Sequence, residues 1–219
     1  KVFFSDLRNS SDIGIKAAKN TLLKCNPKKI NTCQLDVVFH PRVARTLLAH
    51  FASLVNGSSI VRGSSFLKEK LNQKIFKNEI NIIDNPNIIR GLSSKPFDDE
   101  GCSMEKINLV ENGILKNWIL DTTTSKQLGM ASNSRASRGV SSPPTPSPTN
   151  MFIDNGSKSS KQLLNEVNNG FYVTDLIGQG VNLITGDYSR GASGFKIENG
   201  KISFPINEVT IADNLNDMF

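Results

Sequence analysis

Residues 176–200 read LIGQGVNLITGDYSRGASGFKIENG, and this stretch decides the class of fold. Its apolar and glycine residues predict two β-strands around a glycine-rich loop, followed by a hairpin turn at Asn199-Gly200. Asn-Gly favours such a turn because both residues accept the positive φ values that match the twist of paired strands. Asn112-Gly113 repeats the pattern between two further apolar segments. Two such hairpins predict a largely antiparallel sheet.

Helical spacing of apolar residues, together with capping residues and prolines, predicts most of the remaining elements. Helices are expected at residues 11–23, 41–55, 64–71 and 160–168, and short strands at 35–39, 80–83, 171–176 and 208–212. We therefore expect an α+β fold. In this fold a strongly curved, largely antiparallel and barrel-like sheet is flanked by a few helices.

Residues 131–148, ASNSRASRGVSSPPTPSP, are rich in serine and proline. Proline removes backbone donors and serine favours turns, so no packed element is expected in this segment. A flexible linker is one interpretation. Because a strand-like segment follows at once, we favour a long surface or channel-lining loop within one domain.

Composition narrows the class of protein. No apolar run approaches the ~18 residues of a membrane-spanning helix. The first residues lack the apolar core of a signal peptide. Cys25, Cys33 and Cys102 are odd in number and form no CxxC pair, which favours free thiols in a reducing cytosol over a disulfide framework. We expect a cytoplasmic protein without membrane contact.

The chain carries a formal net charge of +6, which permits contact with the phosphates of nucleic acid. Its basic residues are nevertheless scattered, and they usually alternate with acidic residues. The densest basic runs contain almost no aromatic residue that could stack on a base. This distribution is typical of a solvated basic surface, so we do not expect a nucleic-acid partner.

The two histidines, His40 and His50, are the first candidates for a metal site. A zinc-binding helix needs a second histidine about one turn away and a glutamate beside the first. Residues 40–57 read HPRVARTLLAHFASLVNG and contain no acidic residue. We therefore expect His50 to be a packed or surface histidine rather than a metal ligand.

The acidic run Asp98-Asp99-Glu100 is a second candidate. Paired carboxylates can serve acid–base chemistry or bind a cation. Adjacent acids point in different directions, however, and a turn is the commoner setting for such a run. We favour the turn.

The motif GDYSRG at 186–191 is the third candidate, because it places a carboxylate, a phenol, a hydroxyl and a guanidinium between two glycines. The four residues are Asp187, Tyr188, Ser189 and Arg190. They could form a binding site. Alternatively, the motif is a tight loop that needs Gly186 and Gly191 for backbone freedom, with Arg190 bound internally to Asp187.

Four motifs, in order, resemble the PmbA (TldE) branch of the TldD/PmbA family, whose members are also called modulators of DNA gyrase. They are VRGSSFLKEKLNQKIF (61–76), PFDDEG (96–101), ENGILKNWILDTTTSKQLG (111–129) and the opening stretch at 176–200. The resemblance covers about residues 36–219. It implies that 36–219 form the family's C-terminal domain, truncated at its C-terminus. Residues 1–35 would then be a remnant of, or a connection from, an N-terminal domain.

In the TldD branch, a helix upstream of the RGSSF-like segment carries His-Glu-x-x-x-His, and a cysteine near the C-terminus completes the metal site. The corresponding positions here read Leu48, Ala49, His50, Phe51, Ala52 and Ser53. Neither ligand position holds histidine, and the position of the catalytic base holds Ala49. The resemblance therefore implies a non-catalytic relative without a cofactor of its own, with zinc expected only in a TldD-type partner.

The resemblance also implies partners. We expect a non-catalytic subunit of a cytoplasmic TldD/TldE-type metallopeptidase complex that holds unfolded peptides, paired with a TldD-type subunit or with a second copy of itself. Residues 187–190 would then face the bound peptide. Two alternatives stay open at this point: a metallopeptidase active in its own right, and a basic module that acts on DNA gyrase or DNA.

Overall fold

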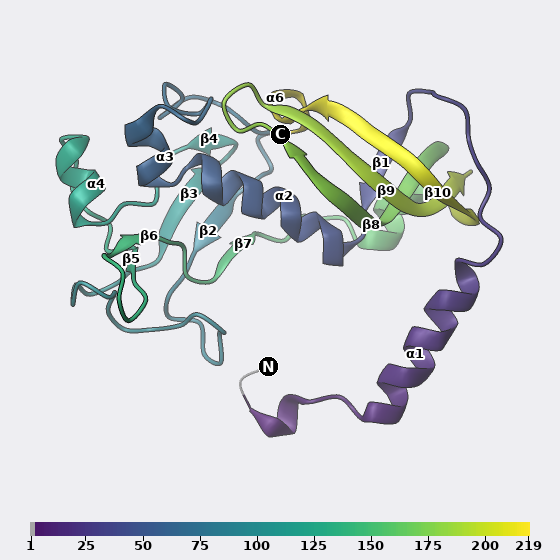
Figure 1. Ribbon diagram of the computed structural model, residues 1–219, viewed down its shortest axis with the longest axis horizontal. Coiled ribbons are helices and arrows are strands. Elements are labelled where there is room, and N and C mark those ends of the chain that lie inside the picture. Colours follow the sequence, from purple (N-terminus) through teal and green to yellow (C-terminus); the bar gives the residue numbers. More distant parts are fainter. Residues whose placement is uncertain (1–2) are drawn as a thin grey trace.

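The computed structural model describes residues 3–219 and shows two four-stranded sheets on either side of one long helix (Figure 1). The large sheet contains β1 (Asp36–Phe39), β8 (Asn169–Val181), β9 (Asp187–Glu198) and β10 (Lys201–Asn214), in that spatial order. The small sheet contains β4 (Ile114–Leu115), β3 (Ile107–Glu111), β2 (Ile82–Asp84) and β7 (Met151–Ile153), also in spatial order. A ribbon of β5 (Ala136–Ser137) and β6 (Thr145–Pro146) forms a third, two-stranded sheet.

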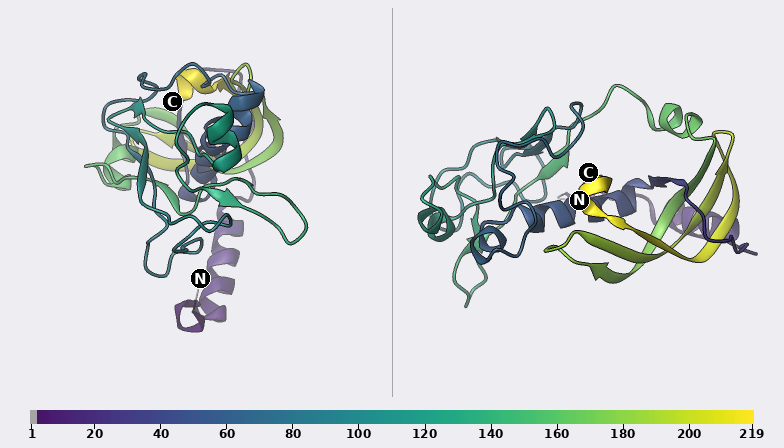
Figure 2. Two further views of the ribbon diagram at one scale, coloured as in Figure 1. Left: turned by 90° about the vertical axis from the view of Figure 1, so that its left-hand side faces the viewer. Right: turned by 90° about the horizontal axis from the view of Figure 1, so that it is seen from above.

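Helices, most of them short, accompany these sheets. They are η1 (Phe4–Asp6), α1 (Ser10–Leu23), α2 (Pro41–Leu54), α3 (Gly57–Arg62), α4 (Thr122–Gln127), α5 (Ser160–Asn165) and α6 (Leu215–Met218). None of the helices within residues 3–219 combines the length and apolarity needed to cross a bilayer. The helix α1 buries no residue and projects away from the rest of the molecule (Figures 1 and 2).

The α+β class expected from the sequence is confirmed. The large sheet is antiparallel except where β1 pairs with β8. It is visibly curved when seen from above (Figure 2, right), and β1 and β10 form its two open edges. The strands expected in a single sheet are divided between two four-stranded sheets, because β2, β3, β4 and β7 pair only among themselves within the described residues.

Both Asn-Gly hairpins are confirmed. Asn112 and Gly113 have φ values of 50° and 77°, and Asn199 and Gly200 have values of 50° and 74°. These signs are those of a type I′ turn. Glycine is required at position 113 for a second reason, since a Cβ there would lie 2.3 Å from the Phe76 carbonyl oxygen.

The helix α2 connects the two halves of the molecule (Figure 1). His40 caps it, since Nδ1 accepts a hydrogen bond from the Arg42 amide at 3.1 Å, and Pro41 occupies the first turn. Near its start, Val43 packs with Phe171 and Val173 under the large sheet. Toward its end, Phe51 and Leu54 join the main core, which includes residues of the small sheet. The same helix therefore belongs to both cores.

The predicted helix at 64–71 is wrong. The helix in this region is α3, which starts at Gly57 after the cap residue Asn56 and ends at Arg62, before the capping residue Gly63, whose φ is 69°. A glycine such as Gly57 commonly ends a helix. Here it allows close packing instead, since a Cβ would lie 2.6 Å from the Thr124 hydroxyl and 2.9 Å from the Ile119 carbonyl oxygen.

The expectation of no packed element in 131–148 is also wrong. This segment contains β5 and β6, and it contributes Arg135, whose side chain is fully buried. Nε of Arg135 donates to Oδ2 of Asp84 at 2.5 Å, and Nη2 donates to the Glu105 carbonyl at 2.5 Å. Oδ1 of Asp84 accepts from the Thr149 amide at 2.8 Å. The buried ion pair fixes the segment against the small sheet.

Candidate functional site

The residues Asp187, Tyr188, Ser189 and Arg190 do not form a loop. They are the first residues of β9, the strand that pairs with both β8 and β10. Gly186 has a φ of +86°, as a turn before the strand requires, whereas Gly191 is not among the positive-φ residues. Gly186 therefore lies in a turn, as predicted. The prediction of a tight loop is wrong for residues 187–191, which belong to a strand.

The strand divides the four residues between two faces, because successive side chains of a strand point in opposite directions. Asp187 and Ser189 are exposed, while Tyr188 is buried and Arg190 is half-buried. Asp187 accepts a hydrogen bond from the Thr185 hydroxyl at 2.5 Å. No ion pair joins Arg190 to Asp187 in the described part of the chain, so the predicted internal clamp is wrong.

Tyr188 and Arg190 instead lie with His50 of α2 in what we call the polar cluster. The rings of His50 and Tyr188 meet edge to face, with centroids 6.3 Å apart and an interplanar angle of 81°. Nε2 of His50, Oη of Tyr188 and Nε of Arg190 are all buried, and none has a hydrogen-bond partner within residues 3–219. Buried polar atoms are normally paired, so three such atoms on neighbouring side chains call for an explanation.

Burial and charge set the protonation of the cluster. Burial, assisted by the Arg190 charge, lowers the pKa of His50 below its ordinary value of 6.5. Burial raises the pKa of Tyr188 above 10.0, although Arg190 opposes this rise. Both rings are therefore neutral at neutral pH, and the positive charge of the cluster belongs to Arg190.

The polar cluster does not fit a zinc ion. Zinc in proteins is held by several nitrogen, sulfur or carboxylate ligands. His50 is the one imidazole of the cluster, and its neighbours are a phenol and a guanidinium, whose positive charge repels a cation. Elsewhere within residues 3–219, no group of three or more histidine, cysteine, aspartate or glutamate side chains is placed to hold a metal.

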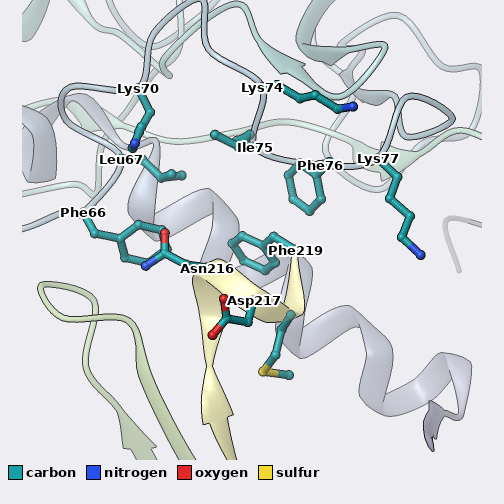
Figure 3. Close-up of a pocket in the computed structure, with 11 residues that line it drawn as sticks. Phe66, Leu67, Lys70, Lys74, Ile75, Phe76, Lys77, Asn216, Asp217 and Phe219 are labelled. Atoms are coloured by element: carbon teal, nitrogen blue, oxygen red, sulfur yellow. The ribbon is translucent and has the colours of Figure 1, made fainter.

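A groove of about 470 Å³ lies beside α6 and forms a second candidate surface (Figure 3). Its apolar lining includes Phe66, Phe76 and Phe219, and the rings of Phe76 and Phe219 are 4.8 Å apart at their centroids. Three lysines, Lys70, Lys74 and Lys77, and one acidic residue, Asp217, also line it. None of the three forms an ion pair with another described residue, so the groove is basic as well as aromatic.

The acidic run is a structural turn, as we favoured. Asp98 is buried and accepts hydrogen bonds from the amides of Glu100, Cys102 and Ala136. Oε2 of Glu100 accepts from the amide and the hydroxyl of Thr122. These carboxylates already have protein partners, so they offer no open site.

His50 was the member of the polar cluster that sequence reasoning missed. The alternation of DYSRG could have placed Tyr188 and Arg190 on one face, had the segment been recognised as a strand. Nothing in the sequence brings α2 against β9, because the two elements are far apart along the chain and meet only through the tertiary fold.

Comparison with known proteins identifies the family. Residues 32–219 match the model of the PmbA/TldA metallopeptidase C-terminal domain, and the chain belongs to the PmbA/TldD family. The metalloprotease PmbA of Escherichia coli O157:H7 is 39% identical over 215 residues, which are 98% of this chain and 46% of that protein. The resemblance drawn from the four motifs is therefore confirmed. The chain spans about half the length of the curated relatives it matches.

Solved structures of other proteins have the same fold as this chain. A putative modulator of DNA gyrase from Thermotoga maritima superimposes with a TM-score of 0.88 at 30% identity, covering 98% of this chain and 49% of that one. TldE from Thermococcus kodakarensis gives a TM-score of 0.84 at 24% identity, covering 94% and 48% of the two chains. The second likeness concerns the fold alone. The family match names a metallopeptidase domain, and the structural likenesses agree with it in fold.

Proposed function

We propose that this chain is a non-catalytic subunit of a cytoplasmic TldD/TldE-type metallopeptidase complex, and that it holds an extended peptide by adding it as a strand to β10. The catalytic zinc would belong to a TldD-type partner. Family membership supports the connection to peptidases. The non-catalytic role, the partner and the peptide are our proposal.

The outer edge of β10 is the observation that supports strand addition most. From Val209 to Asn214, β10 pairs with β9 in regular register, and no described strand pairs with its other side. An edge strand presents unpaired backbone donors and acceptors, which are a template for a further strand. Peptide-binding domains use such edges because the main-chain hydrogen bonds supply affinity for almost any extended sequence.

The two halves of β10 differ in how well their edge is protected. In the first half, Pro205 lacks an amide donor, the register shifts twice, and Lys28 forms a bridge to Ile206. Prolines and bulges are devices that discourage pairing with other chains. The second half, from Val209 onward, has none of these features. This difference favours a partner strand at the second half.

The chemistry around His50 supports the non-catalytic role. A helix that held zinc would present histidine and glutamate together, whereas the helix here presents His50 next to a cation and Ala49 to solvent. All three cysteines are exposed and free, which is compatible with the reducing cytoplasm that we propose.

The test is reconstitution. The chain is mixed with a TldD-type metallopeptidase, and co-elution, zinc content and cleavage of an unstructured peptide are measured. We expect co-elution, zinc in the metallopeptidase only, and cleavage that depends on both proteins. Stoichiometric zinc in the isolated chain that is lost in His50→Ala would show that the chain has a metal site of its own and contradict the proposal.

A matched pair of variants tests the strand edge. Ala212→Lys adds a charge to the open half of β10, and Ser203→Lys adds the same charge to the protected half, where both residues are exposed. We expect Ala212→Lys to weaken peptide binding about tenfold or more, because charged residues discourage strand pairing, and Ser203→Lys to leave it unchanged. Equal effects of the two substitutions would place the peptide elsewhere.

The same edge could pair with a second copy of this chain. That arrangement would make a symmetric homodimer in which two β10 strands form one continuous sheet. Sedimentation of the isolated chain distinguishes the two occupants of the edge. A stable dimer that Ala212→Lys dissociates would assign the edge to self-association.

A further inference from the structure

Arg190 is a half-buried cation that has no counter-charge in ion-pair distance among residues 3–219. Its Nε is buried without a hydrogen-bond partner, and the polar group beside its guanidinium is the neutral hydroxyl of Tyr188. The acidic residue that the register places nearest is Asp213, which lies opposite Tyr188 on β10, but Asp213 is exposed and forms no ion pair with Arg190. A charge removed from water is costly unless an opposite charge compensates it.

The other two side chains add donors but no negative charge. The Tyr188 hydroxyl is protonated, since burial raises its pKa. The neutral His50 imidazole carries one N–H, which can be on Nε2. All three unpaired atoms can therefore donate a hydrogen bond at the same time. A group that only accepts hydrogen bonds and carries a negative charge would satisfy them together, and a carboxylate is such a group.

We propose that His50, Tyr188 and Arg190 form a binding site for a carboxylate of the bound peptide. The inference rests on the proposed function, because it names the chemical group by which the held peptide is recognised. Arg190 lies opposite Ile211 in the half of β10 whose outer edge is open. The guanidinium is thus one strand in from the edge to which we assign the peptide, and a carboxylate that reaches it across β10 would give an otherwise sequence-tolerant edge a preference for one group.

A carboxylate of a peptide has two sources, its C-terminus and the side chains of aspartate and glutamate. Three forms of one uncharged, acetylated, valine- and threonine-rich octapeptide distinguish them. The first has a free C-terminus, the second a C-terminal amide, and the third an amide with glutamate as the last residue. Binding of each form to the 219-residue chain is measured by calorimetry at constant salt.

We expect the free acid or the glutamate form to bind about tenfold more tightly than the plain amide, because charge-assisted hydrogen bonds are the strong ones. Arg190→Gln should abolish this preference, so that the three peptides bind with about equal affinity. Tyr188→Phe retains the ring and removes only the hydroxyl, so it should reduce the preference several-fold. Arg45→Gln is the matched control on α2, since Arg45 is exposed and unpaired among the described residues, and it should retain the preference.

The outcomes separate the two proposals. If none of the three peptides binds, strand addition fails and the carboxylate site fails with it. If all three bind equally well, strand addition stands and the carboxylate site is overturned. If the preference survives in Arg190→Gln but disappears in Lys70→Gln/Lys74→Gln/Lys77→Gln, the carboxylate binds in the basic groove, and the assignment to the polar cluster is wrong.

Discussion

Arg135 and Arg190 occupy contrasting environments in the two halves of the molecule. Arg135 is fully buried beside the small sheet, where it donates to Asp84, Glu105 and Asn133. Arg190 is half-buried beneath α2, where its Nε has no partner among residues 3–219. The comparison shows that burial of a charge does not by itself reveal its role. A charge whose donors are all used belongs to the architecture, and one with unused donors is available to a ligand.

The largest effect is expected at Arg135. Replacing it by methionine, which has a similar length, leaves the Asp84 carboxylate buried without its counter-charge. Removal of one partner of a buried ion pair typically destabilises a protein by about 3–5 kcal/mol. We expect a loss of this size for Arg135→Met in the free energy of unfolding, measured by urea denaturation. A loss below about 1 kcal/mol would show that water or a neighbouring group compensates Asp84.

Sequence alone could predict the parts of this fold that local chemistry determines. Asn112-Gly113 and Asn199-Gly200 specify their turns within two residues, and both hairpins formed as expected. Pro41 likewise marks the start of α2. Family resemblance added the class of protein, because long motifs recur in order along the chain.

What sequence could not predict depends on residues far apart in the chain. Arg135 pairs with Asp84, which is 51 positions away, so the serine- and proline-rich segment around Arg135 resembled a solvent-exposed loop. His50 meets Tyr188 across a still longer separation. The candidate site was therefore predicted in part. Two of its four expected residues, Tyr188 and Arg190, belong to the polar cluster, whereas Asp187 and Ser189 lie on the other face of β9.

The next effect is a pH dependence at His50. Its pKa in the folded protein lies below 6.5, so the unfolded chain binds a proton more readily than the folded chain does. His50 therefore contributes stability that is fully present above pH 6.5 and is lost as the pH falls from 6.5 through the lowered folded pKa. We expect the unfolding free energy of His50→Gln to fall less steeply than that of the parent chain in this window.

NMR titration of the His50 ring checks the cause directly. Burial and the Arg190 charge both lower the pKa of His50, so Arg190→Met should move it upward, toward the ordinary value. His40 is the internal reference, because it caps α2 at the opposite end and lies outside the polar cluster. If the pKa of His50 in the parent chain is 6.5 or higher, the ring is hydrated. In that case the polar cluster is not removed from water, and Arg190 is not the poorly compensated charge that we contrast with Arg135.

The smallest effect on stability is expected at Arg190, and it tests the comparison most directly. Arg190→Met retains most of the apolar stem and removes a guanidinium that has no protein partner within residues 3–219. Replacing a poorly compensated buried charge by an apolar residue of similar volume is often neutral or stabilising. We therefore expect the unfolding free energy to stay within about 1 kcal/mol of the parent value, or to rise, in the same urea experiment that detects the loss in Arg135→Met.

Arg45→Met, at an exposed position of α2, provides the baseline for a surface substitution. If Arg190→Met loses as much stability as Arg135→Met, the guanidinium has structural partners in solution, and Arg190 is part of the architecture rather than a group reserved for a ligand.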